Sequence, residues 1–331
     1  MLKLPFFDLS LSQKCLLLLE DKKLNGQIIK QYYFQRESFL DIFHRLCNEK
    51  NIDEVDIINF IIKLFYVYIY PYKIKETLTL EKISLLFEQF IFRRQGCKVL
   101  SNKQKLRKKL LSLSFSLAMI ADICKTAHIA KDILLCSLTH TSQFLGIDIG
   151  SGSGILLLLQ YILAKRNKFD QIYLYGIERN KNVLNKTKNF LEHLNIKVYL
   201  LNKDAKQKDI YQLFKNKKIS FLCNETLPGM GVRLWKEDFI TINKVLFQEL
   251  NKELDNTKFF PKKVLVIDKR KTTQLILEPK NQFLSNTSLP LNLFYTYAIY
   301  LENNFFPLKK IGLDFKKYLN PGWEPYLNLR W

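Results

Sequence analysis

The chain has 331 residues, of which 47% are hydrophobic, and its formal net charge is +21. This length allows one large domain or two modest ones, and the apolar share supports a packed core rather than a disordered chain. The charge indicates an anionic partner such as nucleic acid. However, the excess is mostly lysine in a chain rich in Asn, Ile and Phe, which AT-rich coding sequence also favours, so both explanations stay open.

Six cysteines are scattered along the chain without a Cys-x-x-Cys pair, which disfavours a metal site and indicates buried thiols in a reducing compartment. The first residues show no apolar signal-peptide segment. The most apolar run, residues 57–70, is interrupted by Asn59 and Lys63 and is too short to span a bilayer. We therefore expect a cytoplasmic protein without a membrane span or a metal ion.

The amino-terminal region, residues 1–100, is expected to be mostly helical. Apolar residues recur at helical spacing over 37–47, 53–67 and 78–92. The region shows no catalytic signature. We interpret it as a helical cap that packs on the rest of the chain, with substrate or partner binding as the alternative.

The most informative motif begins the central region, residues 101–270. The apolar run 144–149 predicts a buried strand, Gly150, Gly152 and Gly154 follow it, and an apolar helix begins at Ile155. Glycines without a Cβ let the backbone approach a ligand closely. Turns of this kind at the carboxyl end of a parallel strand commonly hold a nucleotide.

Details of this turn narrow the kind of nucleotide. A dinucleotide fingerprint, Gly-x-Gly-x-x-Gly, fails because Ile155 stands at its last position, and no Gly-Lys-Ser/Thr of a P-loop is present. Asp148, two residues before the first glycine, would repel a pyrophosphate. It suits a ligand with cationic groups, such as S-adenosylmethionine (SAM), which carries a sulfonium and an ammonium. A tight strand–helix turn without a ligand is the structural alternative.

Similar units follow in order along the chain. Three further strands are expected over 171–177, 197–201 and 219–223, and each is followed by an acid: Glu178, Asp204 and Glu225. Glu178 lies where a carboxylate can accept hydrogen bonds from ribose hydroxyls. A helix over 235–254 and a fifth strand over 264–267 complete the expected core.

With these motifs the chain resembles the class I, seven-strand, Rossmann-like SAM-dependent methyltransferases, an α/β fold. The resemblance implies SAM as the cofactor, with ribose on Glu178 and the adenine amino group on Asp204. The residues expected to bind the cofactor are Asp148, Gly150, Ser151, Gly152, Gly154, Glu178, Arg179, Asp204, Ala205 and Asn224.

The methyl acceptor is expected beside the segment that follows the fourth strand. Glu225 and Glu237 bracket a loop there, and two carboxylates can clamp a cationic nitrogen and stabilise the charge that develops on it. This loosely resembles the double-glutamate loop of protein arginine methyltransferases, although Asn224 stands where serine is usual and the gap is longer. We predict Glu225 and Glu237 as catalytic residues. The alternatives are a capping acid for Glu225 and a helix-start carboxylate for Glu237.

The last region, residues 271–331, is expected to be a β-rich extension with strands over 273–277 and 291–300. Taken together, the motifs predict N-methylation of a protein side chain or small amine. A methyltransferase of RNA or DNA, motivated by the charge, and a catalytically silent SAM-fold binding module are the alternatives. Nucleic acid is therefore kept as a partner but not favoured.

Overall fold

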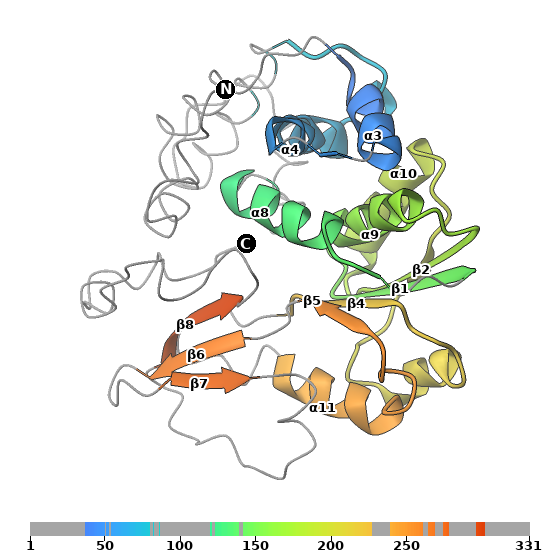
Figure 1. Ribbon diagram of the computed structural model, residues 1–331, viewed down its shortest axis with the longest axis vertical. Coiled ribbons are helices and arrows are strands. Elements are labelled where there is room, and N and C mark those ends of the chain that lie inside the picture. Colours follow the sequence, from blue (N-terminus) through green and yellow to red (C-terminus); the bar gives the residue numbers. More distant parts are fainter. Residues whose placement is uncertain are drawn as a thin grey trace.

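The computed structural model describes about half of the chain, in which helices and strands alternate (Figure 1). The described residues are 37–49, 51–52, 54–79, 82, 86, 120, 123–138, 142–226 and 239–260, together with the strands 264–268, 274–277 and 296–301. This part of the chain has a mixed α/β fold built around a parallel sheet, as the sequence predicts.

The parallel sheet has five strands in the order β3-β2-β1-β4-β5. They are β1 (Gln143–Ile149), β2 (Gln171–Ile177), β3 (Tyr199–Leu201), β4 (Phe221–Asn224) and β5 (Lys258–Phe260). Every neighbouring pair is parallel, and Asp148 of β1 lies opposite Gly176 of β2 and Cys223 of β4. The strand order reverses between β1 and β4, and the carboxyl ends of strands at such a reversal are the usual ligand site of this kind of sheet.

Helices cover both faces of the sheet (Figure 1). On one face lie α9 (Ile155–Arg166), which follows β1, and α10 (Lys181–His193), which follows β2. On the other face lie the 3-10 helix η2 (Lys208–Phe214) and α11 (Phe239–Glu249). The helix expected over 235–254 thus ends at Glu249, and turns follow it.

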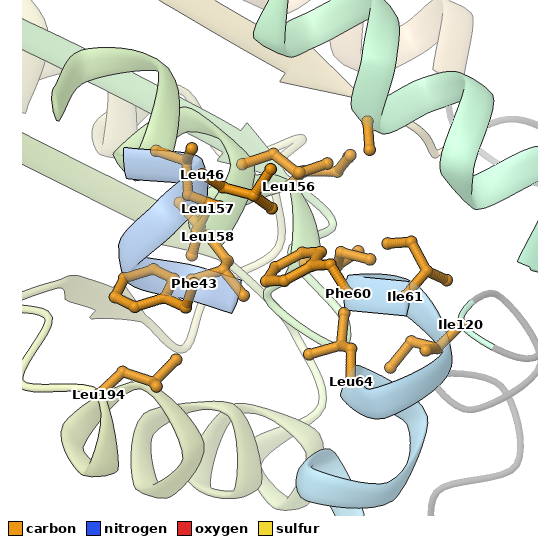
Figure 2. Packing of buried hydrophobic residues seen from close by; sticks show 14 of the residues in the cluster. Phe43, Leu46, Phe60, Ile61, Leu64, Ile120, Leu156, Leu157, Leu158 and Leu194 are labelled. Atoms are coloured by element: carbon orange, nitrogen blue, oxygen red, sulfur yellow. The ribbon is translucent and has the colours of Figure 1, made fainter. Parts of the chain in front are cut away.

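A second layer of helices packs over α9. It contains α3 (Phe39–Asn48), α4 (Glu54–Ile69), η1 (Pro71–Lys73) and α8 (Ile123–Leu134). Contacts of α3 and α8 with α9 join this layer to the sheet, and Figure 2 shows Phe43 and Leu46 of α3 near Leu156 of α9. The helices expected over 37–47 and 53–67 are therefore confirmed, whereas the segment 78–92 lies mostly outside the described residues.

Lys63 of α4 is a cation that lies fully buried in the helical layer. Its Nζ donates a hydrogen bond to the carbonyl oxygen of Glu37 at 2.6 Å. The Glu37 carboxylate in turn accepts two hydrogen bonds from Arg45, each 2.7 Å long, and Arg45 also bonds Asp56 at 2.8 Å. Burial lowers the pKa of Lys63 to about 8.

The fifth strand differs from the sequence prediction. The sheet continues with the short β5, while residues 264–267, predicted as the fifth parallel strand, belong to β6 (Val264–Asp268). This strand pairs antiparallel with β7 (Gln274–Leu277) and β8 (Thr296–Leu301) in a separate sheet. The prediction was wrong because β6 has the stronger apolar pattern, and only pairing with β4 identifies the three residues of β5 as a strand.

Candidate functional site

The turn after β1 has the backbone conformation that its three glycines allow. Gly150, Gly152 and Gly154 have φ angles of +72°, +46° and +72°, in the left-handed region where a side chain is strained. A Cβ on Gly150 would lie 2.7 Å from Cγ2 of Thr226, and one on Gly154 would lie 2.4 Å from Cγ2 of Thr187. At Gly152 the nearest described atom would be the Gly150 carbonyl oxygen at 3.5 Å, an ordinary van der Waals contact, so the described residues leave room for a small side chain there.

Backbone hydrogen bonds fix this turn against the end of β2. The amides of Gly150 and Ser151 both donate to the carbonyl oxygen of Ile177, at 2.8 and 3.1 Å. The Gly152 carbonyl oxygen accepts a hydrogen bond from the hydroxyl of Thr187 on α10 at 2.6 Å. The turn therefore does not point its first two amides at a ligand, as a turn that binds a pyrophosphate would.

Glu178 lies beside the same turn, directly after β2. Its carboxylate accepts hydrogen bonds from the amide of Gly152 at 3.2 Å and from the amide of Asn180 at 2.7 Å. The side chain is half-buried, and each carboxylate oxygen can accept a further hydrogen bond. The structure thus places Glu178, the residue predicted to bind the ribose, beside the glycine turn.

Asp148, the last residue but one of β1, is completely buried. Neither carboxylate oxygen has a hydrogen-bond partner among the described residues. The pKa of Asp148 is raised well above its ordinary value. Burial is the largest cause, and the negative charges of Glu225 and Glu178 add to it. The hydroxyls of Ser151 and Ser153 in the adjoining turn are also buried without a partner there. Unsatisfied buried polar atoms are rare because each one costs free energy, so their gathering at one turn is informative.

The segment after β4 lies on the other side of the strand-order reversal. The side-chain amide of Asn224 donates to the Asn243 side chain at 2.9 Å, and its oxygen accepts from the amide and hydroxyl of Thr226, at 3.1 and 2.6 Å. Asn224 therefore shapes the loop and joins it to α11. Glu225 is half-buried at the end of β4, close enough to Asp148 to raise its pKa. Glu237 lies outside the described residues.

The remaining predicted cofactor residues lie after β2 and β3. Asp204 is half-buried and accepts a hydrogen bond from the amide of Lys206 at 3.0 Å. Ala205 is buried, and its carbonyl oxygen accepts a hydrogen bond from the Tyr211 hydroxyl at 2.6 Å. Arg179 is exposed beside Glu178.

Two residues without a predicted role shape the site. Asn202, directly after β3, donates from its side chain to the carbonyl oxygens of Glu178 and Arg179, each at 3.0 Å. It ties the strand end that carries Asp204 to the one that carries Glu178. Its place after β3, matching that of Glu178 after β2, is the signal that could have identified it. Thr187, which bonds the glycine turn, gives no comparable signal because it lies in the middle of a helix.

The arrangement as a whole is acidic. Three carboxylates, those of Asp148, Glu178 and Glu225, surround a turn in which the described residues leave room at Gly152. Such a site favours a cationic ligand over a phosphate-bearing one. In the described part of the chain, no three His, Cys, Asp or Glu side chains are grouped so that they could hold a metal ion.

Comparisons with protein-family models and with curated proteins find no match for this chain. Among the described helices, none combines the length and the apolar character needed to cross a membrane.

Proposed function

We propose that this chain is a SAM-dependent methyltransferase of the seven-strand class and that the cofactor lies over the glycine turn. The observation that carries the proposal is the buried, unpartnered carboxylate of Asp148 beneath that turn. The cationic ammonium or sulfonium of SAM would stabilise the ionised form of this carboxylate. A Cβ on Gly152 would make only an ordinary contact with the described residues, so they leave room for a ligand to approach the backbone there.

The other strand ends have complementary roles in this proposal. Glu178 accepts hydrogen bonds from the ribose hydroxyls, and Asp204 with the buried Ala205 borders the adenine. When it is bound, SAM supplies a methyl group that is open to attack by a nucleophile. A dinucleotide is disfavoured, because the amides of Gly150 and Ser151 already bond Ile177 and the surrounding carboxylates repel phosphate.

Glu225 is the acceptor-side residue of the proposal. A carboxylate at the carboxyl end of β4 can orient an amine and stabilise the positive charge that develops on its nitrogen. The hydrogen bonds of Asn224 favour an amine acceptor over a nucleobase, because its side-chain oxygen already accepts from the amide and hydroxyl of Thr226 and one of its two N–H groups already bonds Asn243. A second carboxylate from Glu237 stays a prediction.

Binding experiments test the cofactor. Calorimetry should show that the wild-type chain binds SAM, and adenosine more weakly, but not NAD. Glu178→Ala should weaken both SAM and adenosine by about tenfold, because it removes charge-assisted contacts to the ribose that the two ligands share. Asp209→Asn, an exposed acid on η2, is the matched control and should bind both ligands like the wild type. Wild-type binding of NAD in preference to SAM would refute the proposal.

Transfer experiments test the acceptor. The chain and tritium-labelled SAM are added to a cell lysate, which is then separated into protein, nucleic acid and small molecules. Label in protein or in small amines supports the amine acceptor. Label in nucleic acid would overturn that choice, and SAM binding without transfer of label to any fraction would indicate a binding module instead.

A further inference from the structure

The parallel sheet carries a pocket near the start of β1 and β2, apart from the glycine turn. It has a volume of about 490 Å³ and is lined by residues that include Leu145, Tyr173, Tyr175, Asn216, Lys217 and Lys218, here called the tyrosine pocket. These residues lie along β1 and β2, as far as Tyr175, and in the loop before β4. Tyr173 lies opposite Leu145, five residues before Gly150, so roughly 16 Å of strand separate it from the glycine turn.

The pocket exists because one face of the sheet is only partly covered. The connection from β3 to β4 contains η2, a 3-10 helix of seven residues, where a doubly wound sheet commonly has a full α-helix. As alternate residues of one strand, Tyr173 and Tyr175 point to the same face, and both side chains are half-buried. The short η2 covers Tyr175 through an edge contact with Phe214 and leaves Tyr173 at the pocket wall.

The rings in and beside the pocket form an aromatic surface. Tyr175 stacks on Tyr199 of the neighbouring strand, with centroids 4.9 Å apart and planes 18° from parallel. Tyr173 has no ring partner in the described part of the chain; its hydroxyl donates to the Gln171 side chain at 3.2 Å. The face of Tyr173 is therefore the ring surface that a planar ligand can cover. Burial raises the pKa of Tyr175, which keeps its phenol neutral beside an anionic ligand.

Cations surround this surface. Lys217 lies 6.0 Å from the Tyr175 ring centroid and Lys197 lies 5.7 Å from that of Tyr199. Lys217 and Lys218 are exposed and form no ion pair with a described residue. Glu253, in the turns after α11, accepts a hydrogen bond from the amide of Asn216 in the loop at 3.0 Å. The neighbouring lysines 208 and 215 differ from this pair, because both lie within 4 Å of Glu249.

We propose that the tyrosine pocket binds a nucleotide, with the base stacked on Tyr173 and the phosphate bound by Lys217 and Lys218. Aromatic rings beside lysines are the combination with which proteins hold nucleotides without reading sequence. The formal net charge of +21 favours an anionic ligand. The same chemistry is present in a free nucleotide and in one unit of a single strand. The pocket lies apart from the proposed SAM site, so this inference holds or fails independently of the methyltransferase proposal.

Fluorescence anisotropy with a fluorescein-labelled uridine dodecamer tests the site at about 0.15 M salt. The wild-type chain should bind it, and Tyr173→Leu, which keeps an apolar side chain against the sheet, should weaken binding about fivefold or more. The double variant Lys217→Gln/Lys218→Gln should weaken binding and reduce the dependence of affinity on salt.

The matched control removes the same number of charges outside the pocket. Lys208→Gln/Lys215→Gln should change the affinity by less than about twofold, because these lysines are paired with Glu249. Equal losses in the two double variants, or no binding by the wild type, would overturn the proposal. A wild-type dimer that Tyr173→Leu dissociates would also overturn it, because the pocket would then hold a second copy of the chain.

Competition experiments show whether the natural ligand is a free nucleotide or part of a single strand. Displacement of the dodecamer by uridine monophosphate at similar concentration supports a free nucleotide as the ligand. Displacement only by unlabelled oligonucleotide supports a single strand that continues beyond the pocket. Because the lysine variants change exposed side chains only, the test does not depend on the stability of Tyr173→Leu.

Discussion

Two fully buried ionisable side chains, Lys63 in the helical layer and Asp148 at the end of β1, have opposite surroundings. Lys63 donates to the Glu37 carbonyl oxygen, and the charges of Glu37 and Asp41 partly offset the effects of burial and of the like charge of Arg45. Asp148 has no hydrogen-bond partner among the described residues, and the charges that act on it, from Glu225 and Glu178, are of its own sign. The fold thus satisfies the buried charge that belongs to its framework. The charge that it leaves unsatisfied lies where parallel sheets bind ligands.

The largest expected effect on stability lies on the framework side of this comparison. Lys63→Ala leaves a cavity in the core and removes the donor of the Glu37 carbonyl oxygen, so the free energy of unfolding should fall by about 2–4 kcal/mol. Urea denaturation measures this change. Lys63→Met keeps the volume without the charge and should cost clearly less. A Lys63→Ala variant as stable as the wild type would refute a framework role for this lysine.

The largest expected effect on catalysis is at the candidate site, from a substitution of Glu225. Glu225→Gln keeps the size of the side chain and removes its charge, so turnover should fall by about two orders of magnitude. SAM affinity, measured by calorimetry, should stay within about twofold. Glu192→Gln, an exposed acid on α10, is the control with the same chemical change. Normal turnover by Glu225→Gln would exclude the acceptor-side role.

Substitutions at two glycines of the same turn should also distinguish a role in stability from a role in ligand binding. Gly154→Ala places a Cβ against the buried Thr187 side chain and should lower the free energy of unfolding by about 2 kcal/mol. Gly152→Ala makes only an ordinary contact with the described residues and should cost only about 1 kcal/mol, from backbone strain. Its main effect should be weaker SAM binding in calorimetry. Equal SAM affinities of Gly152→Ala and the wild type would place the ligand elsewhere.

The smallest effects are the pH dependences, which should have opposite signs. The pKa of Asp148 is raised in the folded state, so the free energy of unfolding should fall as pH rises from about 4 through that raised value. The pKa of Lys63 falls from 10.5 to about 8 on folding, so stability should rise between these two pH values. Urea denaturation across pH should show that Asp148→Asn removes the first slope and Lys63→Met the second. Unchanged slopes would mean that these charges are less buried than the structure indicates.

The sequence predicts the parallel strands β1 to β4 and fails at one edge of the sheet, where β5 lies. The apolar run before Gly150 and the acid of Glu178 after β2 identify β1 and β2, because buried parallel strands and glycine turns have strong local signals. No local signal distinguishes the three residues of β5 from a loop, so the stronger pattern of β6 was taken instead. The pairing of β6 with β8 depends on residues far apart in the chain.

Within the candidate site, the sequence predicts which residues lie close together but not which hydrogen bonds their side chains form. Asp148, Glu178 and Glu225 follow from their places at strand ends. That Asp148 has no hydrogen-bond partner among the described residues, whereas Asn224 bonds Asn243 and Thr226, depends on tertiary packing. The tyrosine pocket is also a tertiary feature, because it results from the short η2 between β3 and β4.

The most direct test of the central claim is the SAM affinity of Asp148→Asn, measured by calorimetry together with the stability of the ligand-free chain. If Asp148 is kept for a cationic ligand, the variant should be more stable than the wild type by about 1 kcal/mol, because a buried charge without a partner is removed. It should also bind SAM about tenfold more weakly or worse. Asp209→Asn should change neither quantity. Wild-type SAM affinity in Asp148→Asn would contradict the account.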